Sequence, residues 1–162
     1  MGLTEKFPTK GIYTLIVFLS NNTQLKVGKL GIQTFPAGYY TYTGSALGKG
    51  ASSLKQRVTR HLKKQKRKFW HIDFLLAHEN ATIITIIAVQ TSRKLECKMN
   101  QYIRERLKTK IPVVGFGASD CKENCKSHLL FFSDIAKEKV LVKKIVKCTR
   151  PMNDHVFVIN VR

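Results

Sequence analysis

Residues 39–61 constrain the fold of this chain more than any other stretch. Residues 39–43 are all tyrosine or threonine, which favour an extended strand, and this pattern ends at Gly44. After a glycine-bearing loop, apolar residues recur at four-residue spacing, which places them on one face of a helix: Leu54, Val58 and Leu62. Arg57 and His61 are also four apart, so they share another face of that helix. The stretch therefore predicts a strand, a loop and a helix in succession.

The rest of the chain predicts further short elements. Strands are expected at residues 11–19, at 24–30 as a hairpin partner, at 82–89 as a central strand, and at 129–132, 140–146 and 156–161. Helices are expected at residues 52–64, with Ser52 or Ser53 as the N-cap, at 69–78, and at 92–108, the longest, with Ser92 as its cap. Residues 112–127 predict a loop.

These elements indicate one compact domain. A chain of 162 residues is long enough to bury a hydrophobic core. The element order indicates an α+β fold, with a small mixed or antiparallel sheet, about three flanking helices and extra C-terminal strands. We expect a leader at residues 1–10, a main domain at residues 11–133, and a C-terminal β extension at residues 134–162 that packs on the same domain.

The charge balance points to a polyanionic partner. The chain has 29 Lys and Arg against 10 Asp and Glu, a net charge of +19, and no carboxylate lies between Glu5 and Asp73. Such an excess favours nucleic acid, DNA more than RNA, over a membrane; the alternative is a lysine-rich soluble protein. The residues expected to contact nucleic acid are Lys49, Arg60, Lys63, Lys64, Lys66, Arg67 and Lys68.

Compartment signals indicate the cytoplasm. The N-terminus lacks a basic start followed by a long apolar run, and the apolar stretch at residues 81–89 is too short to cross a membrane. Four cysteines without a secretion signal favour free thiols in a reducing compartment. The sequence gives no indication of the oligomeric state.

Two short motifs and a helix resemble the GIY-YIG nuclease family. Gly11-Ile12-Tyr13 opens the first apolar run, Tyr42-Thr43-Gly44 stands where that family has YIG, and Arg57-x3-His61 follows on a helix. Residues 35–48, 70–76, 95–97 and 115–121 resemble a mainly prokaryotic branch whose biological role is unassigned, and the resemblance runs from about Gly11 to Phe132. The gap between the two short motifs is longer than is usual in the family, which predicts an extra hairpin between them.

The resemblance implies a catalytic role for four residues. The tyrosines of the two motifs, Tyr13 and Tyr42, would face one active site, where a phenol can orient or deprotonate a water. Because an unperturbed tyrosine is a poor base at neutral pH, a nearby cation would have to lower its pKa. Arg57 would stabilise the charge that develops on a phosphodiester, and His61 would position the phosphate or relay a proton. Without the resemblance, two core tyrosines and two surface helix residues explain the same pattern.

Glu96 is the carboxylate that the resemblance implies as a metal ligand. Mg²⁺ or Mn²⁺ prefers oxygen ligands and often takes few protein carboxylates. The chain has no cluster of carboxylates that could bridge two metal ions. Glu105 and Glu79 are the competing candidates, and a solvated helix glutamate is the structural alternative.

Two further groups remain open at this stage. His71 and Asp73 are either part of the site or residues that pin a short helix, and the turn at residues 115–117 is expected to bring Ser119 and Asp120 beside the active face. Cys121-x3-Cys125-x2-His128 resembles part of a zinc site, but a fourth ligand would have to come from Cys97 or Cys148. Idle thiols or a disulfide between Cys121 and Cys125 are the alternatives, and we do not expect zinc.

The sequence therefore supports two functions. The first is a metal-dependent endonuclease that cleaves DNA phosphodiester bonds, with branched or damaged DNA as candidate substrates. The second is a basic DNA- or RNA-binding module that keeps a GIY-YIG-like fold without cleaving. A third, weaker hypothesis is an interaction domain with a structural metal site.

Overall fold

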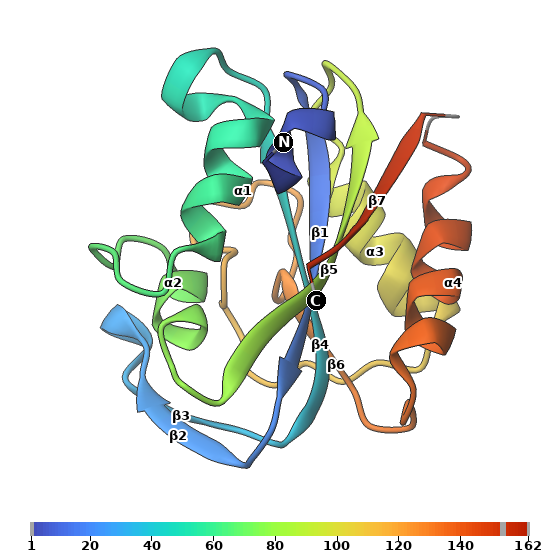
Figure 1. Ribbon diagram of the computed structural model, residues 1–162. Helices are drawn as coiled ribbons and strands as arrows, with labels where there is room; N and C mark the ends of the chain where they lie inside the picture. Colours follow the sequence, from blue (N-terminus) through green and yellow to red (C-terminus); the bar gives the residue numbers. More distant parts are fainter. Residues whose placement is uncertain (1, 153–154, 162) are drawn as a thin grey trace.

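The computed structural model describes residues 2–152 and 155–161 and shows an antiparallel sheet between two layers of helices (Figure 1). The sheet has five strands in the order β6-β4-β1-β5-β7. They are β1 (Gly11–Leu19), β4 (Gly38–Ala46), β5 (Ala81–Gln90), β6 (Leu129–Phe132) and β7 (Val156–Asn160). All four pairs of neighbours are antiparallel, which confirms the predicted α+β fold.

The central strand β1 divides the core in two. Tyr13, Leu15, Val17 and Leu19 pack on the side of α1 (Leu54–Leu62) and α2 (His71–Leu76). Ile12 and Ile16 point to the opposite side, towards α3 (Glu96–Arg106) and α4 (Glu138–Thr149). A strand covered on both faces reads as a nearly continuous apolar run, as residues 11–19 do. The helix pairs lie on opposite sides of the sheet (Figure 1).

An extra hairpin lies between the first two main strands, as the long gap between the motifs predicted. It consists of β2 (Thr23–Lys26) and β3 (Ile32–Phe35), which form a separate two-stranded sheet. The strand expected at residues 24–30 is shorter than predicted, because Gly28–Leu30 forms a 3-10 helix, η2, between β2 and β3. Two further 3-10 helices are η1 (Leu3–Lys6), within the expected leader, and η3 (Gly50–Ser52), before α1.

All three predicted helices, α1, α2 and α3, begin and end within the expected ranges. Helix α1 is capped by Ser53, whose side chain accepts a hydrogen bond from the Gln56 N–H at 3.4 Å. Helix α3 begins at Glu96, not at residue 92, so Ser92 is not its cap. The Thr91 hydroxyl instead accepts from the Arg93 N–H at 3.1 Å, which forms a separate turn before the helix.

The strand predicted at residues 140–146 is wrong, because this segment belongs to α4, the longest helix among the described residues. Leu141, Ile145 and Cys148 lie at helical spacing and pack in the layer with α3, whereas Val140 is largely exposed. The C-terminal segment therefore contributes one helix and one strand, β7, which pairs with β5 at the sheet edge.

In the described part of the chain, no helix combines the length and hydropathy needed to cross a bilayer.

Candidate active site

A cavity of about 820 Å³ collects residues from separate parts of the chain. Tyr13 comes from β1, Tyr42 from β4, Arg57 from α1 and Glu96 from the first turn of α3, and all four line it. These four residues span much of the sequence, so only the packing of helices on the sheet brings them together. The four residues that the motifs indicated therefore lie around one cavity, while their chemical roles remain predictions.

His61 joins this site through a direct contact with Tyr13. The Tyr13 hydroxyl lies 2.8 Å from His61 Nε2, and both side chains are buried. Gly44 is the register partner of Tyr13 on β4, and a Cβ at this position would lie 2.6 Å from the Tyr13 hydroxyl. The glycine of Tyr42-Thr43-Gly44 therefore leaves the space that the Tyr13 phenol occupies.

Burial keeps this pair uncharged. It raises the pKa of Tyr13 to about 12, although the nearby Arg57 guanidinium opposes that shift. Burial, together with the positive charge of Lys66, lowers the pKa of His61 to about 3. At neutral pH a protonated phenol therefore contacts a neutral imidazole, and His61 Nδ1 is buried with no hydrogen-bond partner among the described residues.

Arg57 is held at the cavity wall by two contacts. Its Nη1 donates to the Ser45 carbonyl oxygen at 3.0 Å, at the end of β4. Its guanidinium lies 5.1 Å from the centre of the Trp70 ring, and Arg60 lies 4.4 Å from the same ring. The indole therefore contacts both cations and fixes Arg57 beside the cavity.

Tyr42 forms the neighbouring wall, where the loop of residues 112–127 returns to the sheet. Gly117 has a φ of +68°, and a Cβ at this position would lie 2.8 Å from the Tyr42 ring. The Thr43 N–H donates to the His128 carbonyl oxygen at 3.3 Å, which ties the end of this loop to β4. Ser119 and Asp120 line the cavity, as the turn at residues 115–117 predicted.

Glu96 has the features of a cation ligand. Its Oε2 atom is buried and has no hydrogen-bond partner among the described residues, while Oε1 lies 4.0 Å from the exposed Lys94 ammonium. A buried carboxylate oxygen without a partner is costly unless a donor or cation reaches it. The competing carboxylates, Glu79 and Glu105, are exposed and do not line the cavity.

His71 and Asp73 have different environments. His71 lines the cavity, and its Nδ1 accepts a hydrogen bond from the Gly117 N–H at 2.9 Å. Asp73 is fully buried and binds the Arg60 guanidinium through two hydrogen bonds of 2.7 and 2.8 Å. It also accepts the N–H groups of Phe69 and Trp70, so it fixes the start of α2 and the adjacent cavity wall.

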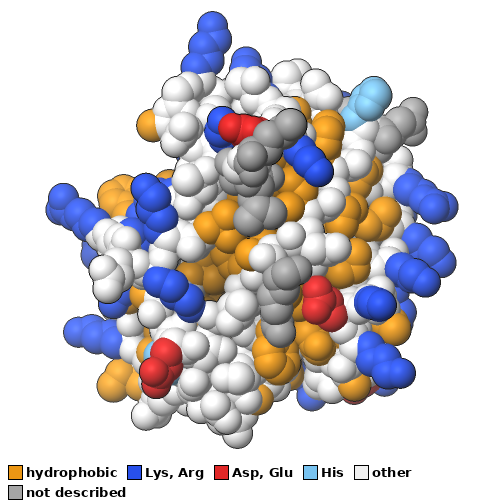
Figure 2. Space-filling view, viewed as in Figure 1, with side chains coloured by type: hydrophobic (Ala, Val, Ile, Leu, Met, Phe, Trp, Pro, Cys, Tyr) orange, Lys and Arg blue, Asp and Glu red, His pale blue; other side chains and the backbone are white. Residues whose placement is uncertain are grey.

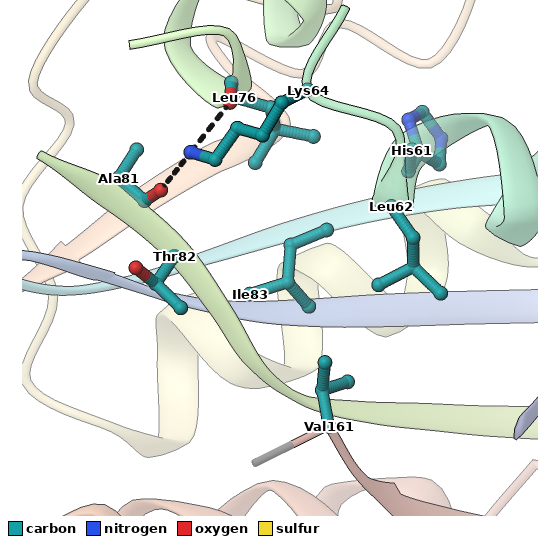
Figure 3. A pocket seen from close by; sticks show the side chains of 8 residues that line it. All are labelled: His61, Leu62, Lys64, Leu76, Ala81, Thr82, Ile83 and Val161. Carbon is teal, nitrogen blue, oxygen red and sulfur yellow. Dashed lines mark hydrogen bonds between the residues drawn. The ribbon is translucent and has the colours of Figure 1, made fainter. Parts of the chain in front are cut away.

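Three of the predicted nucleic-acid contacts also bind the protein's own backbone. Arg60 donates to the Arg67 carbonyl oxygen, and the Lys66 ammonium donates to those of Arg60 and His61 at 3.0 Å. The Lys64 ammonium donates to the carbonyl oxygens of Leu76 and Ala81, beside a small cavity of about 130 Å³ (Figure 3). It also donates to the His78 carbonyl oxygen. The Lys66 contacts close the C-terminal end of α1, whereas the Lys64 contacts join the segment after α1 to the end of α2 and the start of β5.

The other predicted cations are exposed: Lys49, Lys63, Arg67 and Lys68. Figure 2 shows Lys and Arg side chains around the rim of one face, with hydrophobic atoms gathered towards its centre. Phe69 begins the helix expected at residues 69–78, but it precedes α2, is 77% exposed and lines the cavity with Trp70. The sequence did not single out either aromatic residue as functional. The only available signal was that Trp70 begins the segment of family resemblance at residues 70–76 and that Phe69 directly precedes it.

Four possible metal ligands lie together at the cavity, and three of them, Cys97, Cys121 and His128, line it. The ligand atoms of Cys97, Cys121, Cys125 and His128 all lie within 4.8 Å of one another. Cys97 Sγ is 3.4 Å from Cys121 Sγ and 3.5 Å from His128 Nε2. Cys148 is buried on α4 and is not part of this cluster.

Comparison with known proteins gives a family but no activity. No curated protein and no solved structure matches the chain. A family model described as "Domain of unknown function DUF123" matches residues 12–150, which include every residue of the candidate site. The match covers most of the chain, and the chain therefore belongs to DUF123, a GIY-YIG-like family of unknown function.

Proposed function

We propose that this protein is a metal-dependent endonuclease that cleaves DNA phosphodiester bonds, with branched or damaged DNA as its candidate substrates. One observation carries the proposal: two phenols, a guanidinium and a buried carboxylate from four separate elements line the same cavity. These groups can together orient a nucleophile, bind an anion and hold a cation.

Arg57 is the anion-binding group in this proposal. Cleavage of a phosphodiester places negative charge on its non-bridging oxygens, and a planar guanidinium matches two of them at once. The contacts of Arg57 with the Ser45 carbonyl oxygen and the Trp70 ring position its charge before the substrate binds. Preorganised charge of this kind lowers a reaction barrier because it needs no rearrangement during the reaction.

Glu96 is the residue that would hold Mg²⁺ or Mn²⁺. Its buried Oε2 lacks a partner among the described residues, and carboxylate oxygens are the ligands that these hard cations prefer. When bound, such an ion supplies Lewis-acid polarisation of a phosphate oxygen.

Tyr13 and His61 are the proton-handling pair. The Tyr13 hydroxyl orients the attacking water, and His61 Nε2, 2.8 Å away, holds that hydroxyl in position. The positive charge of Arg57 favours ionisation of Tyr13 and opposes the effect of burial. Tyr42 lines the cavity from the neighbouring strand and orients the phosphate in this proposal.

The surface around the cavity suits a nucleic acid backbone. The net charge is +19, and exposed lysine and arginine side chains lie on the segment between α1 and α2. Binding through such contacts weakens with added salt, because phosphate contacts release counterions. Phe69 offers an exposed ring on which an unpaired base can stack.

A plasmid-nicking assay with and without Mg²⁺ or Mn²⁺ tests the proposal. Arg57→Ala and Glu96→Gln are each expected to reduce cleavage by roughly 10²-fold or more, as losses of single charge-stabilising groups do. Glu105→Gln and Arg104→Ala are the matched controls, because both residues are exposed on α3 outside the cavity. Cleavage that both Arg57→Ala and Glu96→Gln leave undiminished would contradict this mechanism.

A second candidate function, a nucleic-acid-binding module without nuclease activity, is favoured by the pKa values of the site. Burial raises the pKa values of Tyr13 and Tyr42 and lowers that of His61. None of the three pKa values is therefore near 7, where a general base is most effective at neutral pH. Salt-sensitive DNA binding without nicking under any divalent cation would favour this function over the endonuclease.

A further inference from the structure

We propose that Cys97, Cys121, Cys125 and His128 form a tetrahedral Zn²⁺ site that fixes one wall of the cavity. The site is separate from the Mg²⁺ or Mn²⁺ position proposed at Glu96, and its ligands are of a different chemical class. Three thiolates and one imidazole are a common ligand set for structural zinc, whereas Mg²⁺ prefers oxygen.

The geometry is close to that of a closed zinc site. A tetrahedron with Zn–S bonds of about 2.3 Å has its sulfur atoms about 3.8 Å apart. Cys97 Sγ and Cys121 Sγ are 3.4 Å apart, Cys97 Sγ and His128 Nε2 are 3.5 Å apart, and no pair of the four ligand atoms exceeds 4.8 Å. The largest separation therefore needs to shorten by only about 1 Å for the four atoms to surround one ion.

Neighbouring donors support two of the sulfur atoms. The Glu123 N–H donates to Cys121 Sγ at 3.4 Å, and Gln101 Nε2 donates to Cys125 Sγ at 3.9 Å. Hydrogen bonds to ligand atoms orient them and stabilise thiolates in metal sites.

The loop that carries Cys121 and Cys125 makes few contacts that would hold it in place without a metal ion. Residues 118–126 contain no large apolar side chain, and most of them are exposed. The backbone hydrogen bonds recorded there are few, such as Cys121 N–H to the Ala118 carbonyl oxygen at 3.1 Å and Gly115 N–H to the Lys126 carbonyl oxygen at 2.7 Å. A structural metal can supply the folding free energy that packing does not supply in such a segment.

Two of the proposed zinc ligands directly follow carboxylate residues that line the cavity. Cys97 lies in the first turn of α3, directly after Glu96, and Asp120 directly precedes Cys121. Both carboxylate-bearing neighbours line the cavity. An ion bound at this cluster would therefore join α3 to the loop and fix the positions of Glu96 and Asp120.

Sequence spacing did not favour zinc, because Cys121, Cys125 and His128 supply only three ligands. The fold brings in Cys97 as the fourth, from a position 24 residues before Cys121. The other candidate, Cys148, lies in the layer of α3 and α4, outside the cluster.

The first test measures metal content and thiol state in the full chain. Protein purified under reducing conditions without chelators should contain about one zinc per chain. After reconstitution with Co²⁺ it should show the visible absorption of a tetrahedral cobalt–thiolate site. Cys97→Ser and Cys121→Ser should each lose most of the bound metal, whereas Cys148→Ser is the matched control and should keep it.

Several results would overturn the proposal. One is wild-type protein that is metal-free and does not bind Zn²⁺ or Co²⁺ after reduction. Others are a disulfide between Cys97 and Cys121 in protein purified under reducing conditions, and iron bound in place of zinc. Equal loss of metal from Cys148→Ser would also contradict it. The wild-type cobalt spectrum decides the question even if Cys97→Ser does not fold.

The zinc proposal and the endonuclease proposal fail separately. Metal content and cobalt absorption are measured without DNA, so an inactive protein can still support the zinc site. Glu96→Gln should reduce cleavage by roughly 10²-fold or more while retaining the zinc, because Glu96 is not one of the four ligands. Loss of zinc from Glu96→Gln would contradict the separation of the two sites.

Discussion

Replacing Asp73 with alanine should destabilise the protein substantially, because its buried carboxylate joins three segments. The carboxylate has no exposed side-chain surface and accepts two hydrogen bonds from Arg60 and two from the N–H groups of Phe69 and Trp70. Asp73→Ala leaves all four donors without their acceptor. Removing one partner of a buried ion pair costs about 3–5 kcal/mol.

The lower end of that range applies here. The Arg60 side chain is 28% exposed, so water can partly replace the lost carboxylate. A loss of about 3 kcal/mol corresponds to a fall in Tm of about 6–12 °C for a chain of this size. The assay is urea and thermal unfolding of Asp73→Ala, with Asp134→Ala as the control. Asp134 is exposed and pairs with the exposed Lys108 at 3.3 Å, so its replacement should leave Tm unchanged.

The pH dependence of Asp73→Asn provides a second measurement on the same residue. Burial alone would raise the pKa of Asp73, but Arg60 and the two backbone N–H groups outweigh burial and lower it. A carboxyl with a lowered folded pKa stabilises the protein above its unfolded value of about 3.9 and loses that contribution as pH falls through the folded pKa. The stability difference between wild type and Asp73→Asn should therefore stay constant from pH 7 to about pH 4.

Two outcomes would refute this reasoning. One is a loss of less than about 1 kcal/mol in Asp73→Ala, which would mean that the ion pair is no stronger than a surface pair. The other is a difference between wild type and Asp73→Asn that already shrinks at pH 6, which would mean that the folded pKa is raised.

Three further predictions concern the cavity and its surroundings. Because burial lowers the pKa of His61 to about 3, the NMR signals of its ring should not titrate between pH 7.5 and 5. The unfolded chain binds the proton more readily, so the protein should lose stability as pH falls from about 6.5 towards 3. A titration midpoint near 6.5 for His61 would contradict this. Gly44→Ala places a Cβ 2.6 Å from the Tyr13 hydroxyl and should cost about 1–3 kcal/mol in urea unfolding, so an unchanged transition would refute the close approach. Phe69→Ala should weaken single-stranded DNA binding by about 1–3 kcal/mol without lowering Tm. Ile32→Ala is the control, because Ile32 is exposed on β3 outside the cavity, and it should leave binding unchanged. Equal effects of the two substitutions on binding would exclude stacking on Phe69.

Local patterns were enough to predict most of the fold. The strand–loop–helix at residues 39–61, the buried strand β1 and the extra hairpin follow from periodicity, turn residues and motif spacing. Helix α4 did not, because residues 140–146 fit both an alternating and a helical pattern. Packing of Leu141 and Ile145 in the layer with α3 selects the helix, and that choice depends on a layer that the local sequence does not contain.

The residues of the candidate site could be predicted, but most of their contacts could not. The motifs indicated Tyr13, Tyr42, Arg57 and Glu96, but not that a buried oxygen of Glu96 lacks a partner. Trp70 was not predicted as a support for Arg57, since an aromatic residue near a short helix is usually part of the core. These features depend on burial and contact distance, which a single sequence does not specify.

By itself, the sequence determined most of the local elements, the positive charge, and the phenol, guanidinium, carboxylate and thiol groups that the chain carries. Only the tertiary structure decided which of these groups meet. It paired Tyr13 with His61 across 48 positions, placed Cys97 beside Cys121, and directed the Lys64 ammonium to the protein's own backbone. The physical reason is that periodicity fixes which face a side chain takes, whereas the packing of helices on the sheet fixes the neighbours that this face contacts.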